Sequence, residues 1–374
     1  MTRRRLVRLG LFLAAPVLAI LFAAVVAALV LVAAGADPVE VLRSTAAYGA
    51  RPASMVATLN KAMSYYLAGI AAAIGFRMLL FNIGIDGQYR LAVFFAAVVG
   101  GAVALPAPLH VGLTVLVAMV VGASWAAIAG ALKAYRGVSE VISTIMLNGI
   151  ATAIIAFLLN TKRLAVQEPG SNNVTTAPIP ASGQVPGIPT EAGTVFGFLL
   201  VTILVGVGYW VLLNRTVFGF ELRASGRSLR AATMSGVNAR RMILVTMVLS
   251  GAVAGLVGLP QLLGETHHYG LDFPAGFGLT GLAIALLGRN HPVGIAIGAL
   301  LWAAMERSGQ ILDLEGVSTE IVTIMQAVIV IAIIVAYELV RRFTVRQQQA
   351  YVGETEGDLE DTTRDGTALA GAAP

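Results

Sequence analysis

The chain has 374 residues, of which 57% are hydrophobic and only 12% are charged, so water cannot be the solvent for most of it. The net charge is +5, and the basic residues gather in loops beside apolar segments, which requires no nucleic-acid partner. Cysteine is absent, and this excludes disulfides, thiolate metal sites and cysteine nucleophiles together.

Apolar segments long enough to cross a bilayer recur along the chain. A helical crossing takes about 17 to 25 residues, and about ten segments are predicted, at 11–34, 62–80, 88–104, 111–132, 140–160, 194–213, 242–263, 276–290, 291–305 and 321–340. The first is longer than a signal-peptide core and is predicted to be an uncleaved anchor. Two short segments meet at Asn290-His291-Pro292 and could form a hairpin that does not fully cross. The predicted fold is an all-α polytopic membrane helical bundle.

The positions of Lys and Arg predict the orientation of these segments, because cytoplasmic loops retain positive charge. The loop at 214–241 carries six Arg, and basic residues also flank the first and last apolar segments, so this loop and both termini are predicted to be cytoplasmic. The Pro- and Asn-rich loop at 161–193 is then external. Residues 351–374 are acidic and rich in Gly, Thr and Ala, which predicts a disordered cytoplasmic tail after one transmembrane domain at 1–350.

An internal similarity relates two distant parts of the chain. Residues 137–146 match 316–325 at seven of ten positions with an offset of 179, and Trp125-Ala-Ala corresponds to Trp302-Ala-Ala. An offset near half the chain indicates two five-helix halves, and because five is odd the halves must have inverted topology. Inverted repeats are typical of transporters, whose substrate path lies near the pseudo-two-fold axis. Chance similarity between two helices rich in Ile, Val and Ala is the alternative.

Polar residues interrupt the apolar segments at two places. The sequence Phe81-Asn-Ile-Gly-Ile-Asp-Gly-Gln88 breaks the second and third segments, and it reads either as a site offered by half-helix ends or as a simple turn. Glu140, Thr144 and Asn148 recur every four residues, so they share one face of a helix. That stripe indicates either a substrate pathway or hydrogen bonds between helices.

Other polar groups give weaker signals. The adjacent His267 and His268 point in different directions and predict no metal site. Glu306-Arg307 reads as a solvated pair at a helix end. The chain lacks a Gly-Lys dipeptide and therefore a phosphate-binding P-loop, so a partner or an ion gradient must supply the energy. No nucleophile, base and orienting group can be assembled, which argues against a membrane enzyme.

The segment from Glu221 to Arg241 is predicted to form a short basic helix between two long apolar segments, placed to touch something at the membrane surface. Together with four other motifs it resembles the permease subunits of bacterial ABC importers, in the branch that serves nucleosides and simple sugars. The motifs occur in order between about Tyr65 and Tyr337. They are Phe-Asn-Ile-Gly-x-x-Gly-Gln at 81–88, Lys133 with 139–148, Arg223-Ala-x-Gly with 231–238, 250–258, and Gly276-Phe-Gly with 286–292.

The resemblance implies a cytoplasmic coupling helix that inserts into a groove of an ATPase. The residues that match it are Arg223, Gly226, Ala231, Ala232, Gly236 and Asn238. It also implies a second permease subunit, two cytoplasmic ABC ATPases that use ATP and Mg²⁺, and a substrate-binding lipoprotein, in the bacterial cytoplasmic membrane. The chain itself would bind no cofactor. A segment that only contacts lipid is the alternative for this loop.

The predicted function is ATP-driven nucleoside import. The candidate pathway residues are Asn82, Asp86, Gln88, Glu140, Thr144, Asn148, Phe277 and Thr280, with Phe277 or Phe81 available for stacking on a base. The chain departs from the family pattern at Thr280, where an acidic residue is usual, and at Asp86, where Glu is more common. Two alternatives stay open: import of simple sugars, and a gradient-driven secondary transporter in which Asp86 or Glu140 binds the coupling ion.

Overall fold

A computed structural model describes residues 21–312 except 23, 34, 36, 168, 169 and 171, and near the C-terminus 320–321, 323–328, 331–332, 335 and 342. The chain divides into two compact units, one formed by residues 1–41 with 320–374 and the other by residues 42–319. Of the first unit the structure describes short helical stretches, including 24–33 and 323–328. The predicted tail at 351–374 and half of the repeat at 316–325 lie outside the described residues.

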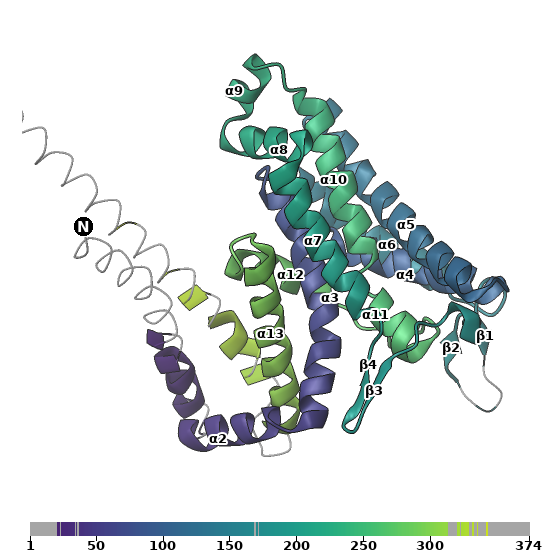
Figure 1. The fold of residues 1–374 in the computed structure, drawn as a ribbon, viewed down its shortest axis with the longest axis vertical. Coiled ribbons are helices and arrows are strands. Elements are labelled where there is room, and N and C mark those ends of the chain that lie inside the picture. Colours follow the sequence, from purple (N-terminus) through teal and green to yellow (C-terminus); the bar gives the residue numbers. More distant parts are fainter. Residues whose placement is uncertain are drawn as a thin grey trace, which may run out of the picture. The chain divides into compact units, whose positions relative to one another are not determined.

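The described chain is mainly helical, as the sequence predicts (Figure 1). Its helices are α2 (Pro38–Gly49), α3 (Pro52–Phe76), α4 (Ile85–Ala102), α5 (Ala107–Arg136), α6 (Glu140–Leu158), α7 (Leu199–Arg215), α8 (Val217–Arg227), α9 (Leu229–Met234), α10 (Ala239–Gly255), α11 (Leu259–Gln261), α12 (Phe277–Leu287) and α13 (Pro292–Leu312). A π-helical turn over Leu262–Thr266 follows α11, and a 3₁₀ turn covers Ala181–Gly183. Within the part of the chain that the structure describes, three helical segments are long and apolar enough to cross a membrane, or up to five if each bent pair counts as one span.

The loop between α6 and α7, predicted to be external, contains two short antiparallel hairpins that the sequence did not predict. One pairs β1 (Val166–Gln167) with β2 (Val174–Thr175), and the other pairs β3 (Ile188–Thr190) with β4 (Gly193–Val195). The β3–β4 hairpin is fixed to α3 through Asn60, whose side chain donates to Thr194 O at 2.9 Å and accepts from Phe196 N at 2.9 Å. The hairpins lie at the opposite end of this unit from α8 and α9 (Figure 1).

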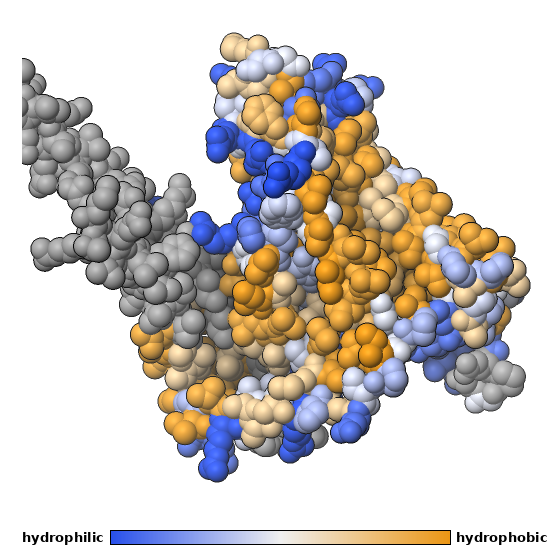
Figure 2. All heavy atoms as spheres, in the orientation of Figure 1, coloured by the Kyte–Doolittle hydropathy of each residue, from blue (hydrophilic) through white to orange (hydrophobic). Residues whose placement is uncertain are grey.

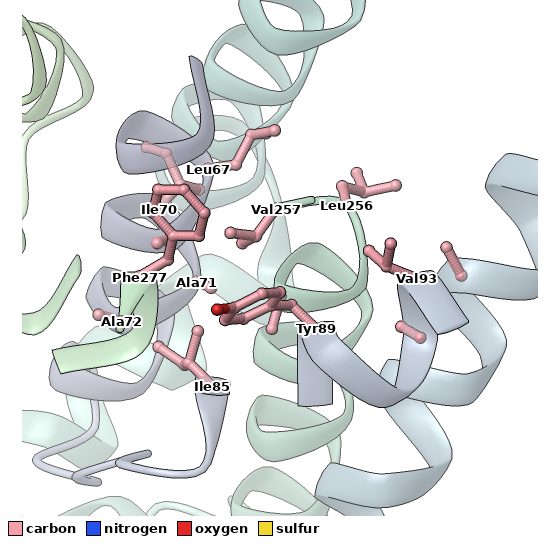
Figure 3. Close-up of a cluster of buried hydrophobic side chains, with 14 of the residues drawn as sticks. Leu67, Ile70, Ala71, Ala72, Ile85, Tyr89, Val93, Leu256, Val257 and Phe277 are labelled. Carbon is pink, nitrogen blue, oxygen red and sulfur yellow. The ribbon is translucent and has the colours of Figure 1, made fainter. Parts of the chain in front are cut away.

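Helix α3 forms the centre of the larger unit and packs against α7, α10, α12 and α13. Its residues 67–76 are all buried, so this part of the helix is apolar on every side, as expected for the middle of a membrane bundle. Figure 3 shows its side chains meeting Tyr89 of α4, Val257 and Phe277 in one apolar cluster. The predicted span began at residue 62, whereas the helix begins at Pro52, where proline fits the first turn.

Helices α5 and α10 make a backbone-to-backbone contact. Gly122 faces Gly251 and Gly255, and a Cβ added at any of the three would overlap the main chain of the opposite helix. Small residues four apart allow membrane helices to approach in this way. Ala118 and Ala126 continue the same surface on α5, where both are fully buried. This contact explains two glycines of the 250–258 motif, Gly251 and Gly255, by packing alone.

The surface of the larger unit is that of a membrane-spanning bundle. Figure 2 shows a broad apolar belt over α5, α7 and α10, with hydrophilic residues gathered at α8–α9 and at the opposite end. On α7 the large side chains of Leu200, Ile203 and Leu204 are more than half exposed. So extensive an apolar surface is tolerated in lipid and not in water. The protein is therefore a multi-pass integral membrane protein.

Candidate functional site

The basic loop is built as two short helices with side-chain caps at each start. After α7 the chain bends by 74° into α8. Thr216 caps α8 by accepting from Gly219 N at 3.0 Å, Ser228 caps α9 by accepting from Ala231 N at 3.3 Å, and Asn238 caps α10 by accepting from Arg241 N at 3.0 Å. Each cap satisfies a helical N–H that has no partner in its own helix. The sequence predicted one short helix here, and the structure has two.

The six predicted coupling residues divide into an inward and an outward group. Gly226 lies against the main chain of Arg77, and Ala232 is the buried residue of α9. Ala231, Gly236 and Asn238 are exposed. Gly236 has a φ of +92°, a left-handed conformation that ends α9 and favours glycine.

The remaining coupling residue, Arg223, is half-buried, and its Nη1 atom has no hydrogen-bond partner in the described chain. Sequence reasoning missed the apolar part of the same surface. Met234 is 91% exposed, and Val217 and Phe220 are also largely exposed. Apolar residues inside an otherwise basic segment were the signal that could have identified them. The surface combines arginines with apolar side chains, a composition found at protein interfaces.

Arg77, directly after α3, binds α7 and the turn between α12 and α13. Its Nη2 donates to Asn290 O at 2.6 Å and its Nε donates to the Tyr209 hydroxyl at 3.3 Å. The Tyr209 hydroxyl also donates to Asn290 O, at 2.9 Å. Arg289 and Asn290 both have a φ of +55°, so the turn between α12 and α13 holds two non-glycine residues in the left-handed region. The end of α3, α7 and this strained turn therefore meet at one guanidinium.

The break between α3 and α4 is held by amide side chains that bind one another. Asn82 Nδ2 donates to Gln88 Oε1 at 3.0 Å, and Gln88 Nε2 donates to Asn82 Oδ1 at 2.9 Å. Asn82 also donates to Ser250 Oγ at 2.9 Å, and Ser250 donates to Ala71 O at 2.7 Å. Asn82, Gln88 and Ser250 are buried. This network joins α4 and α10 to the middle of α3.

The polar stripe of α6 faces the bundle, and its members have partners. Asn148 donates to Ile83 O at 3.0 Å and accepts from Gly87 N at 2.8 Å, which fixes α6 to the start of α4. Thr144 donates to Glu140 O at 2.7 Å, and Glu140 forms an ion pair with Lys133 at 2.8 Å across the α5–α6 turn. The sequence left a pathway and interhelical bonding open for this stripe, and Asn148 makes such bonds.

Two helix N-termini meet at Asp86. This residue lies in the first turn of α4, and its Oδ1 accepts from Gly276 N at 3.0 Å and from Gly278 N at 3.3 Å at the start of α12. Helix N-termini carry partial positive charge, so one carboxylate stabilises both. Phe277 is buried, with its ring centroid 5.1 Å from that of Tyr65 and 5.6 Å from that of Tyr89. Figure 3 shows Phe277 and Tyr89 in the same cluster. Thr280 is half-buried in the same turn.

A lateral cavity of about 450 Å³ lies between α3, α7 and α13. Its lining is almost wholly apolar and includes Met63, Tyr66, Trp210, Pro292 and Leu300. It offers few groups that could bind hydroxyls or amides. The surroundings of Asp86 are therefore a better candidate for binding a polar ligand than this cavity.

Comparison with known proteins gives a consistent result. Residues 54–336 match the family described as branched-chain amino acid transport system / permease component. The chain is 33% identical to the guanosine ABC transporter permease protein NupP of Bacillus subtilis, over 75% of this chain and 81% of the relative. It is 32% identical to the glucose ABC transporter permease protein TsgB13 of Haloferax volcanii, over 91% and 92%. It is 30% identical to the nucleoside ABC transporter permease protein NupB of Lactococcus lactis, over 86% and 90%. No solved structure matches the chain significantly.

Proposed function

Since this chain belongs to the family of branched-chain amino acid transport system permease components, we propose that it is the membrane-spanning permease subunit of an ATP-driven ABC importer and that it translocates nucleosides. The proposed substrate class is based on the similarity to NupP and NupB, which are named as guanosine and nucleoside permeases. The family leaves no reason to retain the gradient-driven alternative. The chain transports and catalyses no reaction, and ATP with Mg²⁺ is used by a separate subunit.

The α8–α9 element is the surface that we assign to the ATPase. Its exposed Met234, with Ala231 and Gly236 beside it, can enter a groove, and the arginines around it can meet acidic residues or lipid phosphates. The inward residue Gly226 transmits the contact, because it lies against Arg77 and Arg77 holds the α12–α13 turn. Movement of the ATPases thereby reaches the helices around the pathway.

The pathway that we propose passes Asp86, Phe277 and Thr280, where α4 and α12 both begin. In the numbering of the predicted spans these are the third and eighth helices, which inverted five-helix halves would make equivalent. Half-helix ends near the membrane centre bind polar ligands in many transporters. The other candidates form the framework around this place, because their side chains bind one another or the main chain. They are Asn82, Gln88, Glu140, Thr144 and Asn148.

The complete assembly contains a second permease, in nucleoside systems a paralogue, with two ATPases and a substrate-binding lipoprotein. We place it in the cytoplasmic membrane with both termini of this chain and the α8–α9 element inside. The arginines of the 214–241 loop support that orientation. The tail at 351–374 is then a cytoplasmic extension of a single transmembrane domain.

Import of simple sugars is the second candidate, because the glucose permease TsgB13 covers more of this chain than the nucleoside relatives do. The test is reconstitution of the co-purified complex in liposomes, with its lipoprotein receptor and internal ATP. ATP-dependent uptake of radiolabelled guanosine, unaffected by excess glucose, supports the proposal. Uptake of glucose that guanosine fails to inhibit would replace nucleosides with sugars. Recovery of the chain without an ATPase would contradict the importer itself.

A further inference from the structure

A cluster of charged and aromatic side chains joins α3, α12 and α13. Lys61 Nζ lies 3.3 Å from Glu306 Oε1, and the Tyr65 hydroxyl donates to Glu306 Oε2. The ring of Phe277 packs edge-to-face on Tyr65, and the Lys61 ammonium lies 5.2 Å from the centre of the same ring. One cation, one anion and one hydroxyl thus lie beside an aromatic wall.

The two charges lie inside their helices and not at the ends. Lys61 is nine residues after Pro52, the first residue of α3, and Glu306 is six residues before Leu312, the last residue of α13, so they lie about 14 and 9 Å from these helix ends. Charged side chains at such a depth are costly unless they pair or face a wet cavity. These two do pair, yet their side chains remain 34% and 35% exposed, whereas residues 62–65 beside Lys61 are buried. Both side chains are therefore still partly accessible to a ligand.

The cluster adjoins the meeting point of the two helix starts. Phe277 carries the ring on which Lys61 and Tyr65 rest, and its neighbours Gly276 and Gly278 donate to Asp86. Ala275 and Gly276 are exposed. A ligand at the start of α12 would therefore have Glu306 on the side of α13 and Asp86 on the side of α4.

We propose that Glu306, held in place by Lys61 and Tyr65, accepts hydrogen bonds from the vicinal 2′- and 3′-hydroxyls of a ribonucleoside in the pathway. A carboxylate has about four acceptor positions, and the two contacts described leave one on each oxygen for a pair of adjacent hydroxyls. Lys61 balances the charge, so the cluster as a whole suits a neutral ligand. This inference rests on the proposed nucleoside function and adds to it a preference for the ribose over the deoxyribose ring.

The test compares uptake of guanosine and 2′-deoxyguanosine by the reconstituted complex. The same receptor is used with every variant, so its own preference cancels when the uptake ratio is compared with wild type. For Glu306→Gln we expect the guanosine preference to fall about tenfold, as the loss of a charge-assisted hydrogen bond does. Glu191→Gln removes a carboxylate from the exposed β3–β4 hairpin and should leave the ratio unchanged.

A structural defect alone would reduce uptake of both nucleosides and leave their ratio as it was. If Glu306→Gln does not reach the membrane, Glu306→Asp keeps the charge, shortens the side chain and tests the same ratio. An unchanged ratio in a complex that imports guanosine would overturn this inference and leave the proposed function intact. Failure of the wild-type complex to import either nucleoside, while the receptor still stimulates its ATPase, would overturn both.

Discussion

Gly226 of α8 lies directly on the main-chain carbonyl of Arg77, at the end of α3. A Cβ at position 226 would overlap that oxygen, so the two segments touch without an intervening side chain. The contact places the proposed ATPase-binding element on the same residue that binds Asn290 and Tyr209. A small substitution at position 226 should therefore uncouple transport from ATP hydrolysis.

For Gly226→Ala we expect ATP-dependent uptake to fall about tenfold or more, since a displacement of about an ångström can cost that much. Alanine would otherwise favour a helix by about 1 kcal/mol, so helix propensity cannot explain a loss. The matched control is Gly208→Ala in α7, where an added Cβ meets nothing within 4 Å. Equal uptake in the two variants would show that the α8 contact does not matter for transport.

Arg77→Lys should weaken coupling while the protein still folds. Lysine keeps the charge but cannot present the planar fork that reaches both Asn290 O and the Tyr209 hydroxyl. We expect fewer nucleosides imported per ATP hydrolysed, measured as the ratio of uptake to phosphate release in proteoliposomes. Arg136→Lys, at an exposed position ending α5, should keep the wild-type ratio.

The amide pair at the α3–α4 break predicts a non-additive effect on stability. Asn82→Leu leaves the buried Gln88 amide without its partner, at a cost of about 1–3 kcal/mol. The double variant Asn82→Leu/Gln88→Leu should lose less stability than the sum of its two single variants. Thermal unfolding of the purified protein in detergent measures the difference. Simple additivity would mean that the pair contributes no coupling energy.

The glycine contact of α5 and α10 predicts strong sensitivity to a single methyl group. In Gly251→Ala the new Cβ would overlap Gly122 O and Ala126 Cβ, and overpacking of this kind costs about 1–3 kcal/mol. Gly149→Ala in α6 adds the same group where nothing lies within 4 Å. We expect only Gly251→Ala to lower the melting temperature. Similar melting temperatures would contradict the close approach of the helices.

Much of the helical framework could be predicted from the sequence, because apolar runs in a membrane protein report directly on helices. The inward direction of Thr144 and Asn148 followed from their four-residue spacing, and Thr144 is fully buried. Such local signals depend only on nearby residues.

The cluster at Lys61 and Glu306 could not be predicted, for a physical reason. The second predicted span begins only at residue 62 because Lys61 before it is charged. From the sequence, Glu306-Arg307 is interpreted as a solvated pair at a helix end. In the structure α3 extends to Pro52 and α13 to Leu312, so both charges lie inside helices. A pairing between residues 245 positions apart depends on how the helices pack, and hydropathy carries no such information.

The backbone contact of α5 and α10 also has a mechanical consequence. Side chains between two helices keep the backbones apart and let one helix slide against the other. At Gly122, Gly251 and Gly255 no side chain separates the backbones of α5 and α10. Helix α10 begins at the Asn238 cap, next to the end of α9. A displacement of α9 would therefore move α10 and α5 together as one rigid pair, and this pair extends to the end of the bundle opposite α8 and α9.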